Sequence, residues 1–274
     1  MASSLLTAQR LVQLAPFQQQ LKTSWYLCAA AAFSVCNQPK EIPKLYHFAL
    51  LSESRQEEQV MEVARQAIAI AETDQASMPQ LLAHLYPSVT PFQKMVSEQF
   101  REALLKSSVL CGLPKAINSL AALKEATPND LKPQVTELDP NDPKNALGPV
   151  RKSRKQSLEF YKEEGLEHWN HVYSKVSGKV MNNLNSSYPD LWYFALCHVY
   201  GPIIAFDEIL NARETSLLII ACLVPQDVNA QLWGHLKGAL NVGCSGESIE
   251  AARSMSILIS KWCGVRWQGE IVKL

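Results

Sequence analysis

The stretch QLWGHLKGALNVG, residues 231–243, has the apolar spacing of an amphipathic helix. Asp227 is a predicted N-cap ahead of it, and Gly243 is a predicted stop behind it. At about 100° per residue, the apolar positions in this region fall on one stripe: Val228, Leu232, Leu236, Ala239 and Leu240. His235 lies near the middle of the stripe, and Lys237 lies almost opposite. We therefore expect His235 to point inward, toward either a pocket or a solid core.

The same helical spacing continues on both sides of this stretch. Residues 157–176 place six apolar or small residues on one face: Leu158, Tyr161, Gly165, Trp169, Val172 and Val176. Residues 97–126 are interpreted as two helices separated at Gly112 and Pro114, a C-cap followed by proline. Convincing alternation of period two, the mark of strands, is absent. The sequence therefore predicts an all-α fold.

Residues 126–155 interrupt the helical pattern. They hold a third of the chain's 15 prolines in a polar context, which predicts a linker or a long surface crossing. The helices on either side end alike, at Cys111-Gly112 and at Cys263-Gly264, so the flanks look like diverged copies of one unit. We therefore expect a divergent first helical unit (1–125), a proline-rich linker (126–155) and a second helical unit (156–274).

Composition narrows the class of protein. The 26 basic and 26 acidic residues balance, which gives no reason to expect a nucleic-acid partner. No run reaches the roughly 20 apolar residues of a membrane helix, so we expect no membrane span. The seven cysteines form no CxxC pair and no zinc-ligand spacing. They are interpreted as small buried residues of a protein from a reducing, intracellular compartment.

Two stretches bear on the compartment. Residues 1–22 carry Arg10 and Lys22 but no acid, which resembles a mitochondrial presequence and fits an ordinary first helix equally well. The tripeptide VKL, residues 272–274, resembles the peroxisomal tripeptide S-K-L, with valine in place of a small residue. These stretches leave the cytoplasm and the matrix of a peroxisome or mitochondrion open.

Residues 213–264 resemble the carboxymuconolactone decarboxylase family. The resemblance lies in an apolar helix (SLLIIACLV), a polar turn (PQDVNA), HLKGALNVG, an acidic turn (SGESIEA) and a last amphipathic helix (ARSMSILISKWCG). Residues 161–210 resemble the family's N-terminal portion, and the tandem arrangement is similar to fungal members, some of them peroxisomal. The resemblance implies helical rings of three or six chains, and the amphipathic helix at residues 246–262 also predicts self-association. The resemblance further implies that His235 lies near the reacting carbon of a small cyclic carboxylate.

The sequence departs from the family pattern at several positions. Pro202 stands where a glutamate commonly follows the family's aromatic-glycine motif. Val228 and Gln231 stand where the related alkylhydroperoxidase D branch has its two CxxC cysteines, which argues against a dithiol peroxidase. In the first unit Leu45 takes the place of the histidine. His47 matches only after a register slip that turns it off the apolar stripe, so we expect this copy to lack a site.

Three further histidines need an interpretation. His198, within the apolar-aromatic run WYFALCHVYGP, is a second candidate site residue that could line the His235 pocket or be buried. Glu164, His168 and His171 share one helix face and could bind a metal, although a solvated polar face explains them without one. We assign no metal and no cofactor.

Three functions remain open at this point, the third of them less favoured. The first is a cofactor-free lyase or isomerase for a small carboxylate or lactone, with His235 as general acid or base. The second is a non-catalytic oligomeric scaffold or ligand-binding protein of the same fold. An antioxidant role of the alkylhydroperoxidase type is a third reading, which the absent CxxC disfavours.

Overall fold

A computed structural model of the chain describes residues 4–53, 59–135, 137–141 and 157–274. Within these ranges the chain forms helices and no strand, which confirms the predicted all-α fold. The α-helices are α1 (Ala8–Leu14), α2 (Gln18–Leu21), α3 (Ser24–Val35), α4 (Ile42–Leu51), α5 (Val60–Ala71), α6 (Met78–Leu85), α7 (Pro91–Cys111), α8 (Leu113–Ala126), α9 (Leu158–Tyr173), α10 (Ser177–Ser187), α11 (Pro189–Phe194), α12 (Ala212–Leu223), α13 (Asn229–Asn241) and α14 (Gly246–Trp262). A π-helix, η8 (Ala195–Ile204), follows α11 directly. Short 3₁₀ turns are η1 (Ala15–Phe17), η2 (Pro39–Glu41), η4 (Asn129–Leu131), η7 (Ser174–Val176) and η9 (Val224–Gln226).

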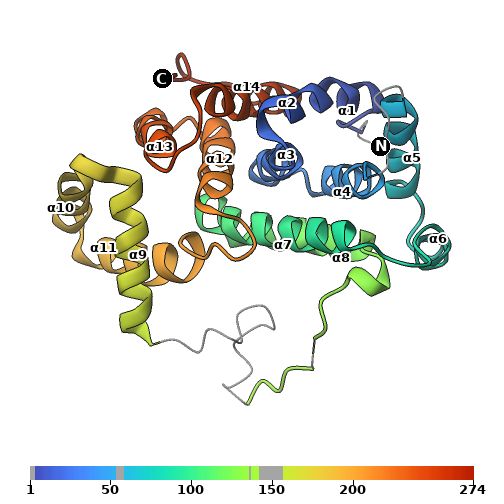
Figure 1. The fold of residues 1–274 in the computed structure, drawn as a ribbon, viewed down its shortest axis with the longest axis horizontal. Coiled ribbons are helices and arrows are strands. Elements are labelled where there is room, and N and C mark those ends of the chain that lie inside the picture. The colour runs from blue at the N-terminus through green and yellow to red at the C-terminus, as the bar shows by residue number, and fades with distance from the viewer. Residues whose placement is uncertain (1–3, 54–58, 136, 142–156) are drawn as a thin grey trace.

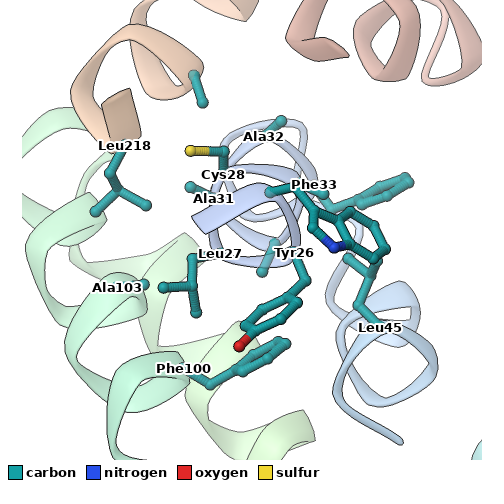
Figure 2. Close-up of a cluster of buried hydrophobic side chains, with 14 of the residues drawn as sticks. Tyr26, Leu27, Cys28, Ala31, Ala32, Phe33, Leu45, Phe100, Ala103 and Leu218 are labelled. Atoms are coloured by element: carbon teal, nitrogen blue, oxygen red, sulfur yellow. The ribbon is translucent and has the colours of Figure 1, made fainter. Parts of the chain in front are cut away.

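Helix α3 forms the centre of the core. Every one of its residues is buried, which fits a helix that is apolar all round. Its alanines let α4, α7, α12 and α14 surround it (Figure 1). Figure 2 shows Leu27 directed toward Ala103 of α7, and the Tyr26 ring stacks on Phe100 at a centroid distance of 5.5 Å. Aromatic stacking and close backbone approach therefore hold this centre together.

The core runs without a break across both predicted units. Helices α3 and α7 of the first unit pack on α12 of the second, and α14 packs on both α3 and α12. The tandem division at residues 126–155 remains a prediction. The apolar face of α14 is covered by these neighbours, with Ile249, Met255 and Ile259 buried. The surface that led us to expect self-association is therefore used inside the chain.

The three glycines that the sequence predicts at helix ends are found there, whereas Asp227, the predicted N-cap of α13, does not cap that helix. Gly112, Gly243 and Gly264 all have positive φ, at 91°, 90° and 79°, and each lies within two residues of the end of its helix. Asp227 is not the N-cap of α13: its φ is 58°, Val228 occupies the cap, and the Asp227 carboxylate accepts the Gln268 backbone N–H at 2.9 Å. A local capping pattern could not reveal this partner, because it comes from the C-terminal segment.

Burial in two regions bears on the expected division of the chain. Ala126, Thr127 and Leu131 are buried, so the start of the predicted linker belongs to the folded body. Described residues 132–135 and 137–141 are exposed, as a surface crossing requires, and residues 142–155 lie outside the described ranges. At the N-terminus, Leu6, Leu11 and Leu14 are fully buried, which favours an ordinary first helix.

Candidate functional site

The helix that carries His235 is held against α9 by close packing. A Cβ added at Gly238 of α13 would meet Val172 Cγ1 of α9 at 2.6 Å, so only glycine permits this approach. The Asn241 side chain donates to the Val172 carbonyl at 2.8 Å. Leu232, Leu236 and Ala239 are buried as predicted, whereas Leu240 is exposed. His235 is partly buried and faces α9 rather than solid core.

The π-helix η8 also packs closely on α9. Its i→i+5 pattern is visible at its end, where Ala205 N–H donates to the Tyr200 carbonyl at 2.7 Å. A Cβ at Gly201 would overlap the Tyr161 carbonyl, and one at Gly165 would lie 2.8 Å from Gly201 N. Glycines on both helices therefore bring η8 and α9 into backbone contact and turn Tyr200 inward.

These contacts build a chain of hydrogen bonds that ends at His235. Tyr173 of α9 lies with its hydroxyl 3.4 Å from His235 Nε2 and 3.1 Å from the Tyr200 hydroxyl. Burial lowers the pKa of His235 to about 4, and nearby His168 adds to the effect. Burial also raises the pKa of both tyrosines. The cluster is thus a neutral imidazole in contact with the neutral phenol of Tyr173, which in turn contacts the neutral phenol of Tyr200, and it can share a proton without holding a charge.

The structure separates the other second-unit histidines from one another. His168 turns inward beside Tyr200, and its Nε2 is buried without a hydrogen-bond partner. His171 on the same helix is exposed. Among the described residues, no group of three His, Cys, Asp or Glu side chains is arranged to hold a metal. His198 is also exposed: its ring contacts are Tyr193 and Phe194, and it does not join the His235 cluster.

A buried lysine ties this cluster to the first unit. Lys106 of α7 has no exposed side-chain surface, and its Nζ donates to the carbonyls of Ile203, Ile204 and Phe206 at 2.7–3.0 Å. Glu102 Oε1 lies 3.9 Å from the same Nζ. The positive charge therefore caps the carbonyl end of η8, where the helix dipole favours a cation. It also lies close enough to His168 to lower that residue's pKa further.

His47 of the first unit lies in a different environment from the one that we expected. Helix α4 is buried on nearly all sides, so His47 is fully buried rather than turned away from the core. Its Nδ1 lies 3.1 Å from the Tyr86 hydroxyl, while its Nε2 has no partner. Burial lowers the pKa of His47 to about 3. A second neutral histidine–tyrosine pair thus lies in the unit that we expected to lack a site.

Tyr86 also lines a cavity of about 1340 Å³ in the first unit. The cavity lies between the start of α4, the helix α6, the end of α8 and η4, which is the side of the molecule opposite α9 and α10 in Figure 1. Apolar side chains of α6, Met78 and Leu82, form part of its wall. The volume exceeds the roughly 300–1,000 Å³ of ordinary ligand pockets. His235 is not among the residues that line it.

An ion pair lies in the cavity wall. Lys44 Nζ is 2.8 Å from Glu41 Oε2 and also donates to Ser4 Oγ. Both charged side chains are 5% exposed. The Glu41 carboxylate accepts the backbone N–H groups of Leu5 and Leu6 at 3.1 and 3.0 Å, so the pair fastens the N-terminal segment over the cavity. Glu72 Oε1, on a half-exposed side chain, lies 3.5 Å from the same ammonium.

Sequence reasoning missed the partners of His235 and missed the cavity. Tyr173 and Tyr200 come from α9 and η8, and no spacing within residues 231–243 points to them. The cavity is assembled from segments between Ser4 and Lys132, with Cys263 added from the end of α14. The apolar spacing of residues 78–85 was the one local signal available, since it indicates a helix with an inward face.

Comparisons with known proteins identify relatives without supplying an activity. No protein-family model matches the chain, and no solved structure matches it, so the resemblance to carboxymuconolactone decarboxylases stays an expectation. Peroxisomal protein 2 of Schizosaccharomyces pombe is 34% identical over 92% of both chains. Peroxisomal protein 2 of Saccharomyces cerevisiae is 52% identical over 99% of this chain and 100% of its own length. At this identity and coverage, the chain belongs to the fungal family named Peroxisomal protein 2.

Proposed function

We propose that the chain is a peroxisomal protein that binds a small carboxylate with an apolar body. The observation that carries the proposal is the cavity between α4, α6 and α8, which combines the apolar wall of Met78 and Leu82 with the buried ammonium of Lys44. Pockets of this kind hold the apolar body of a ligand and orient it with a few polar groups. The location is supported by the name that both relatives carry.

The contacts of Lys44 favour a carboxylate over other polar groups. The Glu41 carboxylate already accepts hydrogen bonds from the backbone N–H groups of Leu5 and Leu6. The Glu72 side chain, by contrast, is half exposed, and its Oε1 lies 3.5 Å from Lys44 Nζ. A ligand carboxylate can take the place of the Glu72 carboxylate and keep the local charge unchanged. The Lys44 ammonium stays paired in this exchange, and the half-exposed Glu72 carboxylate returns to water, so no buried charge is left without a partner.

A thermal-shift screen of small carboxylates tests this proposal. We expect at least one to raise the melting temperature of the protein in a saturable way. Ala83→Trp, at an exposed position on the cavity wall, should abolish the shift by filling the cavity. Ala121→Trp is the matched control, since Ala121 is exposed on α8 and does not line the cavity. A shift that survives Ala83→Trp, or no shift with any carboxylate, would contradict the proposal.

A charge variant tests the class of ligand. Glu72→Gln removes the competing carboxylate, so affinity for an anionic ligand should rise by a few-fold, or up to about 1 kcal/mol. Glu62→Gln is the control, because Glu62 is exposed on the same helix and pairs with Arg65. Weaker binding in Glu72→Gln would argue that the ligand is neutral or cationic at this position.

The location is tested by microscopy. The full-length chain with a fluorescent protein at its N-terminus should coincide with a peroxisomal matrix marker. A second variant without residues 272–274 tests the expectation placed on the VKL tripeptide. Diffuse or mitochondrial fluorescence of the full-length chain would contradict a peroxisomal location.

The second candidate function is a lyase or isomerase centred on His235. The hydrogen-bond chain from His235 through Tyr173 to Tyr200 favours it, because such a chain can pass a proton to or from a bound substrate. His235→Ala and Tyr173→Phe should then lower the turnover of a carboxylate substrate by roughly 10²–10⁴-fold at an unchanged melting temperature. Full turnover in both variants, or a large loss of stability in place of a loss of activity, would reject the role.

A further inference from the structure

Two cysteines from opposite ends of the chain meet on the surface of the core. Cys36 caps the C-terminus of α3 and Cys263 caps the C-terminus of α14, and these two helices pack against each other. Cys263 lines the large cavity together with Gln38, two residues after Cys36, and the two thiols lie close enough for a hydrogen bond between them. Both cysteines are partly exposed, and Cys263 also lies on the wall of the large cavity. Small solutes can therefore reach the pair.

The surroundings of the pair favour one thiolate. The hydrogen bond from Cys263 lowers the pKa of Cys36, and the ammonium of Lys115 and the Ser260 hydroxyl lower it further. Lys115 is held in place by donating to the Val35 carbonyl at 2.7 Å, one residue before Cys36. The same hydrogen bond raises the pKa of Cys263, so that the two sulfurs share one proton. Because the Lys115 ammonium is held beside Cys36, we expect Cys36 to be the thiolate of the pair and Cys263 its neutral partner.

None of the other cysteines is both accessible to solutes and lowered in its pKa. Cys28, Cys197, Cys222 and Cys244 are buried, and burial raises the pKa of each. Cys111 is partly exposed, but burial raises its pKa as well. A thiol reacts with an oxidant as its thiolate and only when accessible, so oxidation should be selective for Cys36.

We propose that Cys36 and Cys263 form a redox-active pair that a hydroperoxide converts into an intramolecular disulfide. The Cys36 thiolate attacks the hydroperoxide, the O–O bond breaks, and the departing alkoxide takes a proton to become an alcohol, or water in the case of hydrogen peroxide. The Cys36 sulfenic acid that results is attacked by the Cys263 sulfur. The S–S bond forms, the S–O bond breaks, and the hydroxyl leaves with the Cys263 proton as water. The two sulfurs lose two electrons and the hydroperoxide gains them.

The pair joins α3 to α14 and so closes most of the chain into one loop. By restricting the unfolded chain, the disulfide should raise the melting temperature by about 5–10 °C. It would also fix the α14 end of the cavity wall. This inference does not depend on the proposed ligand, because its test measures only the sulfurs and the stability of the chain.

The test treats the reduced full-length protein with stoichiometric hydrogen peroxide. We expect a faster band on a non-reducing gel, a Cys36–Cys263 peptide by mass spectrometry, and the rise in melting temperature. Cys36→Ser and Cys263→Ser should lose all three, whereas the control Cys111→Ser should keep them. In Cys263→Ser, a sulfenic-acid trap should label Cys36.

Several outcomes would overturn the proposal. One is a disulfide that joins other cysteines, or a faster band that persists in Cys36→Ser. Another is labelling of Cys36 no quicker than that of Cys111 in the folded protein. Circular dichroism and the melting temperature of the reduced variants verify folding. If Cys36→Ser does not fold, the peptide map of the wild-type chain and the trapping in Cys263→Ser decide the question.

Discussion

Acidification should destabilise the protein between about pH 6.5 and pH 4, because three histidines fold in their neutral form. Burial lowers the pKa of His47 to about 3 and is the main cause that lowers the pKa of His168 and His235 to about 4, against an ordinary value of 6.5. The unfolded chain therefore binds protons that the folded chain rejects. A lowered histidine pKa leaves stability intact above about pH 6.5 and removes it as the pH falls toward the folded value. At pH 5 the loss is about 2 kcal/mol for a fully buried histidine such as His47.

Urea unfolding at pH 7 and pH 5 measures this loss. In His47→Gln the side chain still offers a partner to the Tyr86 hydroxyl but takes up no proton. The variant should therefore lose about 2 kcal/mol less than the wild type between the two pH values, whatever its stability at pH 7. His171→Gln, at an exposed position of α9, should behave like the wild type. Equal losses in His47→Gln and the wild type would refute the neutral burial of His47.

Three further predictions concern packing and assembly. Gly201→Ala should lower the melting temperature strongly, since its Cβ would overlap the Tyr161 carbonyl; Gly178→Ala, with open space around it, should be neutral or stabilising. Lys106→Met should lower the free energy of unfolding by about 3–5 kcal/mol in urea titrations, because three carbonyls of the η8 end lose their donor. The chain should self-associate through the exposed aromatics of α11, so Phe194→Glu should lower the sedimentation coefficient; a wild-type monomer at micromolar concentration would contradict this.

The helices could be predicted because their signals are local. Apolar spacing of three and four residues, with glycines at 112, 243 and 264, is enough to place helices and several of their ends. Trp169 and Val172 are buried on the predicted face of α9, although Leu158 at its start and Val176, in η7 beyond its end, are exposed. End residues deviate because neighbouring helices cover only the middle of this face.

The parts that carry chemistry could not be predicted, because their partners are distant in the sequence. From the sequence alone Lys106 looks like a solvated residue, because the carbonyls of Ile203, Ile204 and Phe206 that surround it lie far along the chain. The inward position of Tyr200 depends on the π-helix, which no period-3.6 pattern describes. The apolar spacing predicts that His235 lies on a packed face of its helix, but its partner Tyr173 lies 62 residues earlier. Periodicity likewise does not show that α4 is buried on nearly all sides. The burial of His47 and the cavity beside it could therefore not be predicted from the sequence.

On the function that we propose, the ligand binds in the first-unit cavity and not at the His235 cluster. The most direct measurement is the dissociation constant, by isothermal titration, of the carboxylate with the largest thermal shift. We expect binding to be lost in Ala83→Trp, at the cavity wall, and retained within a few-fold in His235→Ala. Retained affinity in Ala83→Trp together with lost affinity in His235→Ala, with both variants folded, would contradict the claim and place the ligand at the His235 cluster.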